Sequence, residues 1–289
     1  CLSRGLGDVY KRQEHEAEEK EDERPRVAIV GKPNVGKSSI INKLTGKQRV
    51  IVSDVAGTTR DAIDTNVKYN GKDYVFIDTA GLRRKSKIKE ELERYSIIRT
   101  VTAVERADVV LVVIDATEGV TEQDAKIAGI AHERGKGIII VVNKWDAIEK
   151  NDKTMREYEA KIRQVLSYMP YAEIMYVSAM TGQRLPKLYD MIDMVIENQT
   201  LRIATGVLNE IMTEAVAMQQ PPSDKGKRLK LYYITQVAVK PPSFVIFVNN
   251  KELMHFSYTR YLENKIREAF GFRGTALKFF IRERKEKDQ

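Results

Sequence analysis

Residues 31–38, GKPNVGKS, combine two glycines, a lysine and a hydroxyl at the spacing of a phosphate-binding loop. They follow the apolar run RVAIV and open an amphipathic stretch, which is the strand–loop–helix context that such a loop needs. The glycines let backbone N–H groups turn toward β- and γ-phosphate, Lys37 supplies a positive charge, and the Ser38 hydroxyl can ligate Mg²⁺. The alternative is a glycine-rich turn with a surface lysine, and the surrounding pattern argues against it.

Residues 78–81, DTAG, end a later apolar run, KDYVFID. A carboxylate at this point can hold Mg²⁺ through water, and the Gly81 N–H can donate to the γ-phosphate. Four residues of this kind are common when taken alone. Their position after a phosphate-binding loop, at the end of the next pair of strands, makes Asp78 a candidate for the segment that senses the γ-phosphate.

Residues 143–146, NKWD, end the run GIIIVV and suit recognition of guanine. Asp146 can accept hydrogen bonds from both N1–H and the 2-amino group of guanine, donors that adenine cannot present together. Asn143 would brace the site, and the stem of Lys144 would lie along the base. Residues 178–180, at another strand end, supply a backbone N–H for the guanine carbonyl. Each segment alone could be a surface turn, but their order along the chain predicts GTP.

The elements that must position these residues follow from hydrophobic patterning. The β-branched runs DVVLVVIDA, GIIIVVNK and AEIMYVSA are typical of strands buried on both faces, and each is followed by a helical pattern. Asn70 and Gly71 predict a hairpin between two further strands. This alternation predicts an α/β domain over residues 26–200, a mostly parallel sheet with helices on both faces. Ligands of such sheets bind at the carboxyl ends of the strands, where all the segments above fall.

The pattern changes on either side of this domain. After Thr200 it becomes helix, strand, strand, helix and strand, which predicts a small α+β domain over residues 201–289. Residues 14–23 hold seven carboxylates. Because like charges at that density repel one another, we interpret residues 1–25 as a disordered, acidic linker remnant.

The formal net charge of the 289-residue chain is +8, and most of it lies in the last domain, with 16 Lys and Arg against 9 Asp and Glu. This suggests nucleic acid as a partner, although a solvated basic surface is the alternative. The single cysteine, Cys1, excludes a disulfide framework. No apolar run reaches the ~18 residues that a membrane span requires, and no signal-peptide pattern is present. Together these features predict a cytoplasmic protein.

The chain resembles the EngA (Der) family of P-loop GTPases, bacterial proteins of ribosome assembly with two tandem G domains and a C-terminal KH-like domain. The resemblance rests on GKPNVGKSS, AGTTRD, DTAGLRRK, NKWD, VSA, VKPPSFVIFVNNKELMHFSY and AFGFRGT, and runs from about residue 26 to residue 284. It implies a G domain followed by a KH-like domain. The first G domain of the family is absent here, so an upstream G domain is expected in the full-length protein.

The resemblance also implies roles that the local sequence leaves open. The family places a hydrophobic residue, here Leu82, where Ras-like proteins use glutamine to orient water. Many members bind K⁺ through a loop asparagine that matches Asn34, and such a cation can neutralise charge in the transition state. In AGTTRD, Thr59 matches the Mg²⁺ ligand, with Thr58 as the alternative, and Gly57 lets the backbone approach the nucleotide. Locally, Asn34 could simply cap the loop, and the threonines could fill hydrogen bonds.

The predicted nucleotide site therefore has four sets of residues. The phosphate-binding set is Gly31, Asn34, Val35, Gly36, Lys37, Ser38, Ser39 and Gly81. The switch set is Gly57, Thr58, Thr59, Asp78, Thr79, Ala80 and Leu82. The guanine-binding set is Asn143, Lys144, Asp146, Ser178, Ala179 and Met180. Metal ligands are expected to be Ser38, Thr59 and Asp78 for Mg²⁺, and Asn34 for K⁺.

The last domain fits the element order of a KH-like unit but lacks the usual Gly-x-x-Gly clamp between two helices. Residues 271–274, GFRG, lie between a helix and the last strand, so we expect a helix C-cap and turn there. Lys225, Lys227, Arg228 and Lys230 form a basic loop that could contact RNA phosphates or could merely be solvated. The domain could equally dock on the G domain and relay its nucleotide state.

These observations predict a GTP-binding and GTP-hydrolysing switch that uses Mg²⁺ and K⁺. The resemblance adds action in assembly of the large (50S) ribosomal subunit, with rRNA or the ribosome as partner. One alternative is an RNA-binding module with a catalytically weak nucleotide site, suggested by the absent glutamine and the basic domain. Another is a different P-loop enzyme, such as an ATPase or a small-molecule kinase, and Asp146 argues against it.

Overall fold

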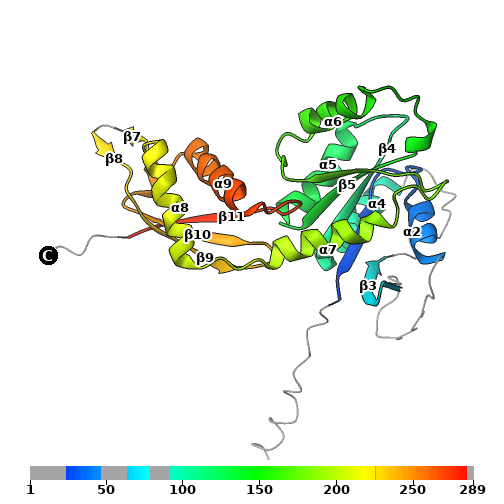
Figure 1. Ribbon diagram of the computed structural model, residues 1–289, viewed down its shortest axis with the longest axis horizontal. Helices are drawn as coiled ribbons and strands as arrows, with labels where there is room; N and C mark the ends of the chain where they lie inside the picture. Colours follow the sequence, from blue (N-terminus) through cyan, green and yellow to red (C-terminus); the bar gives the residue numbers. More distant parts are fainter. Residues whose placement is uncertain (1–23, 47–63, 79–91, 225, 285–289) are drawn as a thin grey trace, which may run out of the picture.

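The computed structural model describes residues 24–46, 64–78, 92–224 and 226–284, which form two units (Figure 1). Several predicted residues lie outside the described ranges, so their predictions stay untested: Gly57, Thr58, Thr59, Thr79, Ala80, Gly81, Leu82 and Lys225. The same holds for residues 1–23 of the expected linker. Within the described residues, no helix has the length and apolar character needed to cross a bilayer.

The first unit is built on a six-stranded sheet with the order β2-β3-β1-β4-β5-β6, in which β2 alone runs antiparallel to its neighbour. All seven residues of β4 and of β5 are buried, as expected for β-branched runs between two helical layers. Asn70 and Gly71 have φ angles of 48° and 85° and turn β2 into β3, so the predicted hairpin is confirmed. The strands are β1 (Arg26–Val30), β2 (Thr65–Tyr69), β3 (Lys72–Ile77), β4 (Val109–Asp115), β5 (Gly137–Asn143) and β6 (Glu173–Tyr176).

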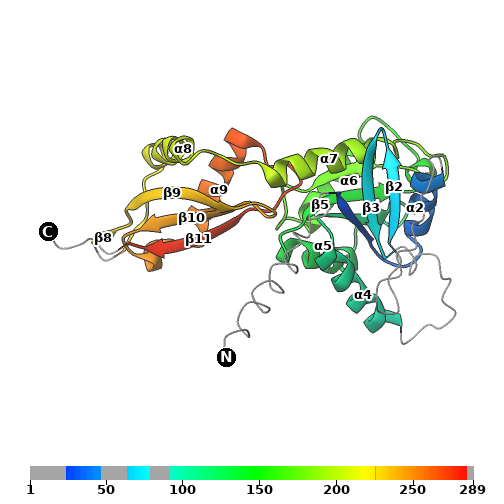
Figure 2. The ribbon, with the colours of Figure 1, turned by 90° about the horizontal axis from the view of Figure 1, so that it is seen from below.

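Helices cover both faces of this sheet (Figures 1 and 2). Leu111 and Val113 of β4 pack into the layer of α2 (Lys37–Gly46) and α7 (Lys187–Thr200). Val110 and Val112 point to the opposite layer, because successive side chains of a strand alternate between faces. That layer contains α4 (Leu92–Arg106), α5 (Glu122–Glu133) and α6 (Thr154–Val165). The predicted α/β class, a parallel-dominant sheet between helices, is confirmed.

The second unit has helices on one face of a three-stranded sheet with the order β11-β10-β9. Its elements follow the predicted order: α8 (Thr205–Met218), β9 (Leu231–Ala238), β10 (Ser243–Val248), α9 (Phe256–Phe270) and β11 (Lys278–Glu283). The expected loop before β9 instead contains a short hairpin of β7 (Ser223–Asp224) and β8 (Lys227–Arg228). Two-residue strands carry no periodicity that a sequence could reveal.

The turn that follows α9 forms the expected helix cap. Gly271 has a φ angle of 81°, and its N–H donates to Arg267 O over 2.8 Å. A positive φ at this position suits glycine because a Cβ would be strained there. The next residues leave the second unit and reach the first.

This turn docks at the amino end of β5, at the edge of the sheet opposite residues 31–38. Ile138 N donates to Gly274 O, and Gly274 N donates to Tyr171 O, both over 2.8 Å. Arg273 donates two hydrogen bonds to the Glu173 carboxylate, at 2.9 and 2.7 Å. A bidentate arginine–carboxylate pair has a strict geometry, so it orients the turn as well as holding it.

Gly274 lies so close to helix α7 that a side chain would clash. A Cβ built on Gly274 would be 2.3 Å from Val195 Cγ2, and Val195 is fully buried. The residue also has a φ angle of 69°. Close approach of the two units therefore requires the absence of a side chain here.

We expect Gly274→Ala to lower the free energy of unfolding by about 1–3 kcal/mol more than Gly271→Ala, because only the first substitution overpacks the interface. The pair is matched, since both glycines have positive φ and a Cβ at Gly271 would meet nothing within 4 Å. Urea unfolding of the two variants measures the difference. Equal losses of stability would contradict a tight contact at Gly274.

Candidate nucleotide-binding site

Residues 31–38 join β1 to α2, as the sequence predicts, and Gly36 is the tightest point of this loop. Its φ angle is 96°, and a Cβ there would lie 2.2 Å from Asn143 Nδ2. Asn34, with a φ angle of 65°, also adopts the left-handed conformation, which asparagine tolerates better than most residues. The lack of a side chain at Gly36 thus leaves room for Asn143, the last residue of β5.

Lys37 lies across this loop. Its Nζ donates to Gly31 O over 2.7 Å and to Lys32 O over 2.5 Å. Burial lowers the pKa of Lys37 to about 8, because desolvation disfavours the ammonium even though two carbonyl oxygens accept from it. A phosphate anion at this position would stabilise the charged form and compete for the same donor.

Asn143, at the carboxyl end of β5, connects the loop to the turn after β6. Its Nδ2 donates to Val35 O over 2.8 Å, and its Oδ1 accepts from Ala179 N over 2.9 Å. The Asn143 side chain is 1% exposed, so both bonds are shielded from water. The structure therefore brings two of the predicted segments together through a third.

Asp146 lies in the short helix η1 (Trp145–Ala147), directly after β5. Its Oδ1 is buried and has no hydrogen-bond partner among the described residues. A buried carboxylate oxygen without a donor costs free energy, on the order of 1–3 kcal/mol or more. Two N–H groups of a guanine would supply the missing donors, so the residue fits the predicted ligand. Trp145 is buried against Tyr158 and Tyr176 and so holds η1 against the G domain core.

Asp115 belongs to this cluster although the sequence reasoning did not identify it. It ends β4 beside Asn143 in the parallel register, and its Oδ2 accepts a hydrogen bond from Lys144 Nζ. Burial opposes its ionisation, yet hydrogen bonds from Lys144 and Thr117 hold the pKa of Asp115 below its ordinary value. The ion pair fixes the lysine stem that is expected to lie along the base. The sequence signal for Asp115 was an acidic residue at the last position of a run that is otherwise apolar.

The turn at residues 178–180 differs in one respect from its predicted role. The Ala179 N–H, one of the donors expected to meet a guanine carbonyl, is taken by Asn143. Ser178 is fully buried, and its Oγ accepts from Thr181 N over 3.1 Å. The Met180 side chain is 75% exposed. The turn is thus shaped by internal hydrogen bonds and stands beside Asp146 through the contact of Trp145 N with Val177 O.

Two of the predicted Mg²⁺ ligands are described, and both end up at the same edge of the sheet. Ser38 lies in the first turn of α2, and Asp78 directly follows β3, which pairs with β1. Asp78 has a φ angle of 52°, and its N–H donates to Asp64 Oδ1 over 3.1 Å. A hydroxyl and a carboxylate are hard oxygen donors that suit Mg²⁺. No group of three or more His, Cys, Asp or Glu side chains forms a metal cage in the described part of the chain.

Lys32, the second residue of the loop, makes a buried junction with α5 that the sequence reasoning also missed. Its Nζ is 2.8 Å from Glu118 Oε2 and 3.5 Å from Asp124 Oδ2. Asp124 is fully buried and forms a capping box with Thr121 at the start of α5. The Lys32 carbonyl, in turn, accepts the hydrogen bond from Lys37. The loop is therefore tied to the helical layer through a charge that has little exposure to water.

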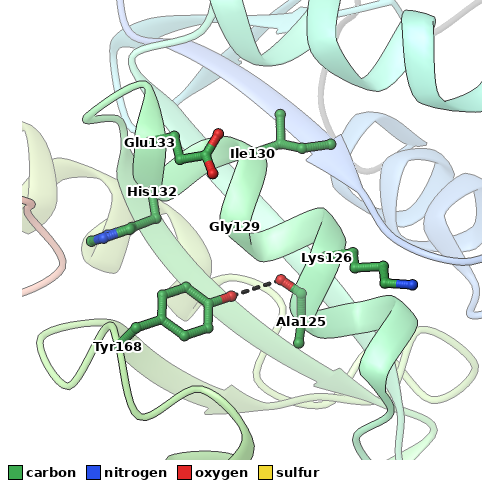
Figure 3. Close-up of a pocket in the computed structure, with 7 residues that line it drawn as sticks. All are labelled: Ala125, Lys126, Gly129, Ile130, His132, Glu133 and Tyr168. Atoms are coloured by element: carbon green, nitrogen blue, oxygen red, sulfur yellow. Dashed lines mark hydrogen bonds between the residues drawn. The ribbon is translucent and has the colours of Figure 1, made fainter.

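A surface pocket of about 480 Å³ lies away from all the predicted site residues, between α5 and Tyr168 (Figure 3). Tyr168 Oη donates to Ala125 O over 2.6 Å and bridges the pocket. The pocket is lined by Ala125, Lys126, Gly129, Ile130, His132, Glu133 and Tyr168. None of these lining residues belongs to the predicted nucleotide site.

The basic residues of the second unit lie far from this site (Figure 1). Lys227 and Arg228 are exposed on β8, and Lys230 is exposed just before β9. Arg228 donates to Gln220 Oε1, and the backbone N–H of Lys230 donates to Asn249 Oδ1. The predicted RNA contacts that are described therefore lie at the outer end of the small sheet.

The fold and the arrangement at residues 31–38 and 143–146 define a P-loop G domain followed by a small KH-like domain. A family model described as "50S ribosome-binding GTPase" matches residues 26–144. A second, described as "KH-domain-like of EngA bacterial GTPase enzymes, C-terminal", matches residues 202–282. The chain belongs to the EngA (Der) family.

Curated relatives agree with this assignment. GTPase Der of Lachnoclostridium phytofermentans is 82% identical over 271 residues, covering 94% of this chain and 62% of that protein. GTPase Der of Agathobacter rectalis is 73% identical over 289 residues, covering 98% of this chain and 66% of that protein. The chain thus spans less than two thirds of the length of these relatives.

Among solved structures, the chain is similar to Era in complex with MgGDPNP and nucleotides 1506–1542 of 16S ribosomal RNA. The two are 25% identical, the match covers 91% of this chain and 94% of the Era chain, and the TM-score is 0.47.

We expect Lys32→Met to lower the free energy of unfolding by about 3 kcal/mol, because it leaves the buried Asp124 carboxylate without its cation. Lys43→Met is the matched control, since Lys43 is exposed on the neighbouring helix α2. A second change, Asp124→Asn, is expected to restore part of the loss in the Lys32→Met background. Urea unfolding of the unaltered chain, Lys32→Met, Asp124→Asn and the double variant completes a double-mutant cycle. Additive losses would show that Lys32 and Asp124 are not coupled.

Proposed function

We propose that the chain binds GTP with Mg²⁺ and hydrolyses it to GDP and phosphate. The observation that carries the proposal is the buried Oδ1 of Asp146, which has no hydrogen-bond partner in the described part of the chain, at the sheet edge where the loop at residues 31–38 also lies. One end of a guanine nucleotide supplies paired N–H donors, and the other supplies phosphates. The chain presents an acceptor for the first and a backbone loop with a lysine for the second.

In this proposal each described residue acts on a defined part of the nucleotide. Lys37 leaves the carbonyl oxygens of Gly31 and Lys32 and donates to phosphate oxygens. Backbone N–H groups of residues 34–39 face the phosphates, and Lys144 lies along the base while Asp115 holds it. Bound Mg²⁺ would neutralise phosphate charge in the loose transition state. Ser38 and Asp78 would hold it, together with Thr59.

The remaining switch residues complete the proposal from the family resemblance. Thr79, Ala80 and Gly81 would follow the γ-phosphate, and Thr58 is the alternative to Thr59. Because Leu82 stands where Ras-like proteins have the glutamine that orients the attacking water, backbone groups would position this water instead. A monovalent cation would neutralise the charge that develops on the phosphates. Loss of the γ-phosphate would release these segments, which is how such switches report hydrolysis.

We further propose that the chain acts on the large (50S) ribosomal subunit in the cytoplasm and that its KH-like domain contacts rRNA. Support comes from the description of the family model as a 50S ribosome-binding GTPase and from the basic charge of residues 201–289. Lys225, Lys227, Arg228 and Lys230 would meet phosphates. Pelleting with isolated 50S subunits is the measurement that separates this contact from GTP hydrolysis itself.

Asp146→Asn is expected to weaken GDP binding by about 100-fold or more and to improve binding of xanthosine diphosphate, because an amide can donate to the oxygen that replaces the 2-amino group. Asp152→Asn is the control, since this carboxylate is exposed and lies six residues further on. Titration of a fluorescent nucleotide analogue, with unlabelled competitors, measures both affinities. Retained guanine preference in Asp146→Asn would reject the assignment of the base site.

Potassium is expected to raise GTP turnover several-fold over sodium at equal ionic strength, through a site that includes the Asn34 side chain. Asn34→Gly should remove this preference, because it keeps the left-handed backbone (φ 65°) while deleting the side-chain oxygen. Asn34→Asp retains an oxygen and should keep the preference. Steady-state phosphate release in each salt is the measurement. Equal rates in both salts for the unaltered chain would remove K⁺ from the mechanism.

A further inference from the structure

The sheet of the second unit has one face covered by helices and one face open. Figure 2 shows strands β9, β10 and β11 from the open side, with α9 behind them. Phe244, Ile246 and Val248 of β10 point into the core formed with α8 and α9. The alternate residues of each strand must therefore point to the open face.

Three aromatic side chains gather on this open face. Phe247 of β10 lies opposite Tyr233 of β9, and their rings stack with centroids 4.3 Å apart and planes within 15°. Phe280 of β11 lies opposite Val245, which shares the open face with Phe247, and Phe280 is 50% exposed. Phe280 is the diagonal neighbour of Phe247 across the parallel pair β10–β11, so it lies beside the stacked rings on the same face, and we call these three side chains the platform.

The charged side chains at the open-face positions of this sheet are all cationic. Arg282 lies opposite Phe247, and Lys278 lies at the other end of β11 on the same face. Arg282 is exposed, and no ion pair recorded among the described residues includes it. No Asp or Glu occupies an open-face position of the three strands. These positions are residues 233, 235 and 237 of β9, residues 243, 245 and 247 of β10, and residues 278, 280 and 282 of β11.

Further cations border the outer end of the platform. Arg284 follows β11, and its N–H donates to Val248 O over 2.9 Å. Asn249, the residue after β10, accepts from Lys230 N over 2.8 Å and donates to Arg228 O over 3.0 Å. The basic segment that the sequence singled out is thus attached to the same end of the sheet.

The turn after α9, which the sequence predicts to be a helix cap and not an RNA clamp, is occupied by the G domain. The turn at residues 271–274, which has the Gly-x-x-Gly spacing, is hydrogen-bonded to Ile138, Tyr171 and Glu173 of the G domain. A strand of RNA could reach its backbone only by breaking the contact between the two units. An RNA contact of this domain must therefore be made elsewhere.

We propose that the open face of β9–β10–β11 binds single-stranded RNA, with unpaired bases stacked on Tyr233, Phe247 and Phe280 and phosphates held by Arg282 and its basic neighbours. Aromatic platforms bind single strands because every base has a π-face, and bordering cations follow the backbone. The proposal rests on the rRNA contact proposed above and assigns it a surface and a chemistry. A protein partner or a second copy of the chain would need acidic groups to meet these cations.

The test measures binding of a fluorescein-labelled, 12-nucleotide single-stranded RNA to the whole chain by anisotropy. Phe280→Ala is expected to weaken binding roughly 5-fold or more, the usual effect of removing one stacking ring. Phe256→Ala is the matched control, because Phe256 is 79% exposed at the start of α9 and does not belong to the open face. Arg282→Gln should reduce the slope of log affinity against log salt by about 0.7, whereas Phe280→Ala should leave it unchanged.

The outcomes separate this proposal from the functions on which it rests. Equal affinities for Phe280→Ala and Phe256→Ala, with RNA still bound, would overturn the platform and leave an rRNA contact in place. Absence of RNA binding by the unaltered chain, with 50S pelleting retained, would overturn it as well and indicate a protein contact. Dimerisation that Phe280→Ala abolishes, measured by light scattering, would assign the face to a second copy. GTP turnover of both phenylalanine variants should equal that of the unaltered chain.

Discussion

The buried side chain of Asn143 is the constraint on which the candidate site depends. One amide group donates to the phosphate-loop carbonyl of Val35 and accepts from the backbone of Ala179, at 2.8 and 2.9 Å. Gly36 must lack a side chain because a Cβ there would collide with this amide. A fully buried amide that lost either partner would leave an unsatisfied polar group, which costs about 1–3 kcal/mol. The loop, the Asp146 segment and the turn at residues 178–180 are therefore positioned together.

Strand β5 links this site to the second unit. Its carboxyl end holds Asn143, and near its amino end Ile138 donates to Gly274 of the turn that follows α9. All seven residues of the strand are buried, and central buried strands are among the least mobile elements of a fold. The small domain is thus docked on the rigid part of the G domain, at the edge opposite the phosphate loop. The Gly-x-x-Gly turn of the small domain therefore contacts the G domain, whereas the open face of its sheet stays exposed.

Local patterns predicted the elements well because each pattern has a local cause. Seven-residue β-branched runs became the buried strands β4 and β5, because such side chains are favoured in buried, extended segments. Asn70-Gly71 became a tight turn, because Asn and Gly tolerate positive φ. Gly271 was expected to cap a helix and does. Asp115 and Lys32 were missed because their partners, Lys144 and Asp124, are distant in the sequence. The short β7–β8 hairpin was missed because two residues carry no period.

The sequence by itself determined which backbone could form: the order of strands and helices, the loop that turns N–H groups inward, and a carboxylate at the end of a buried strand. These depend on interactions between near neighbours, so they can be read without a fold. The tertiary structure alone decided which of these groups share an environment. It buried Asp146 Oδ1 with no donor from the residues that the structure describes, directed Lys37 onto two carbonyl oxygens, and turned three aromatic rings to one open face. Such facts depend on contacts between distant segments, and packing sets those contacts rather than local preference.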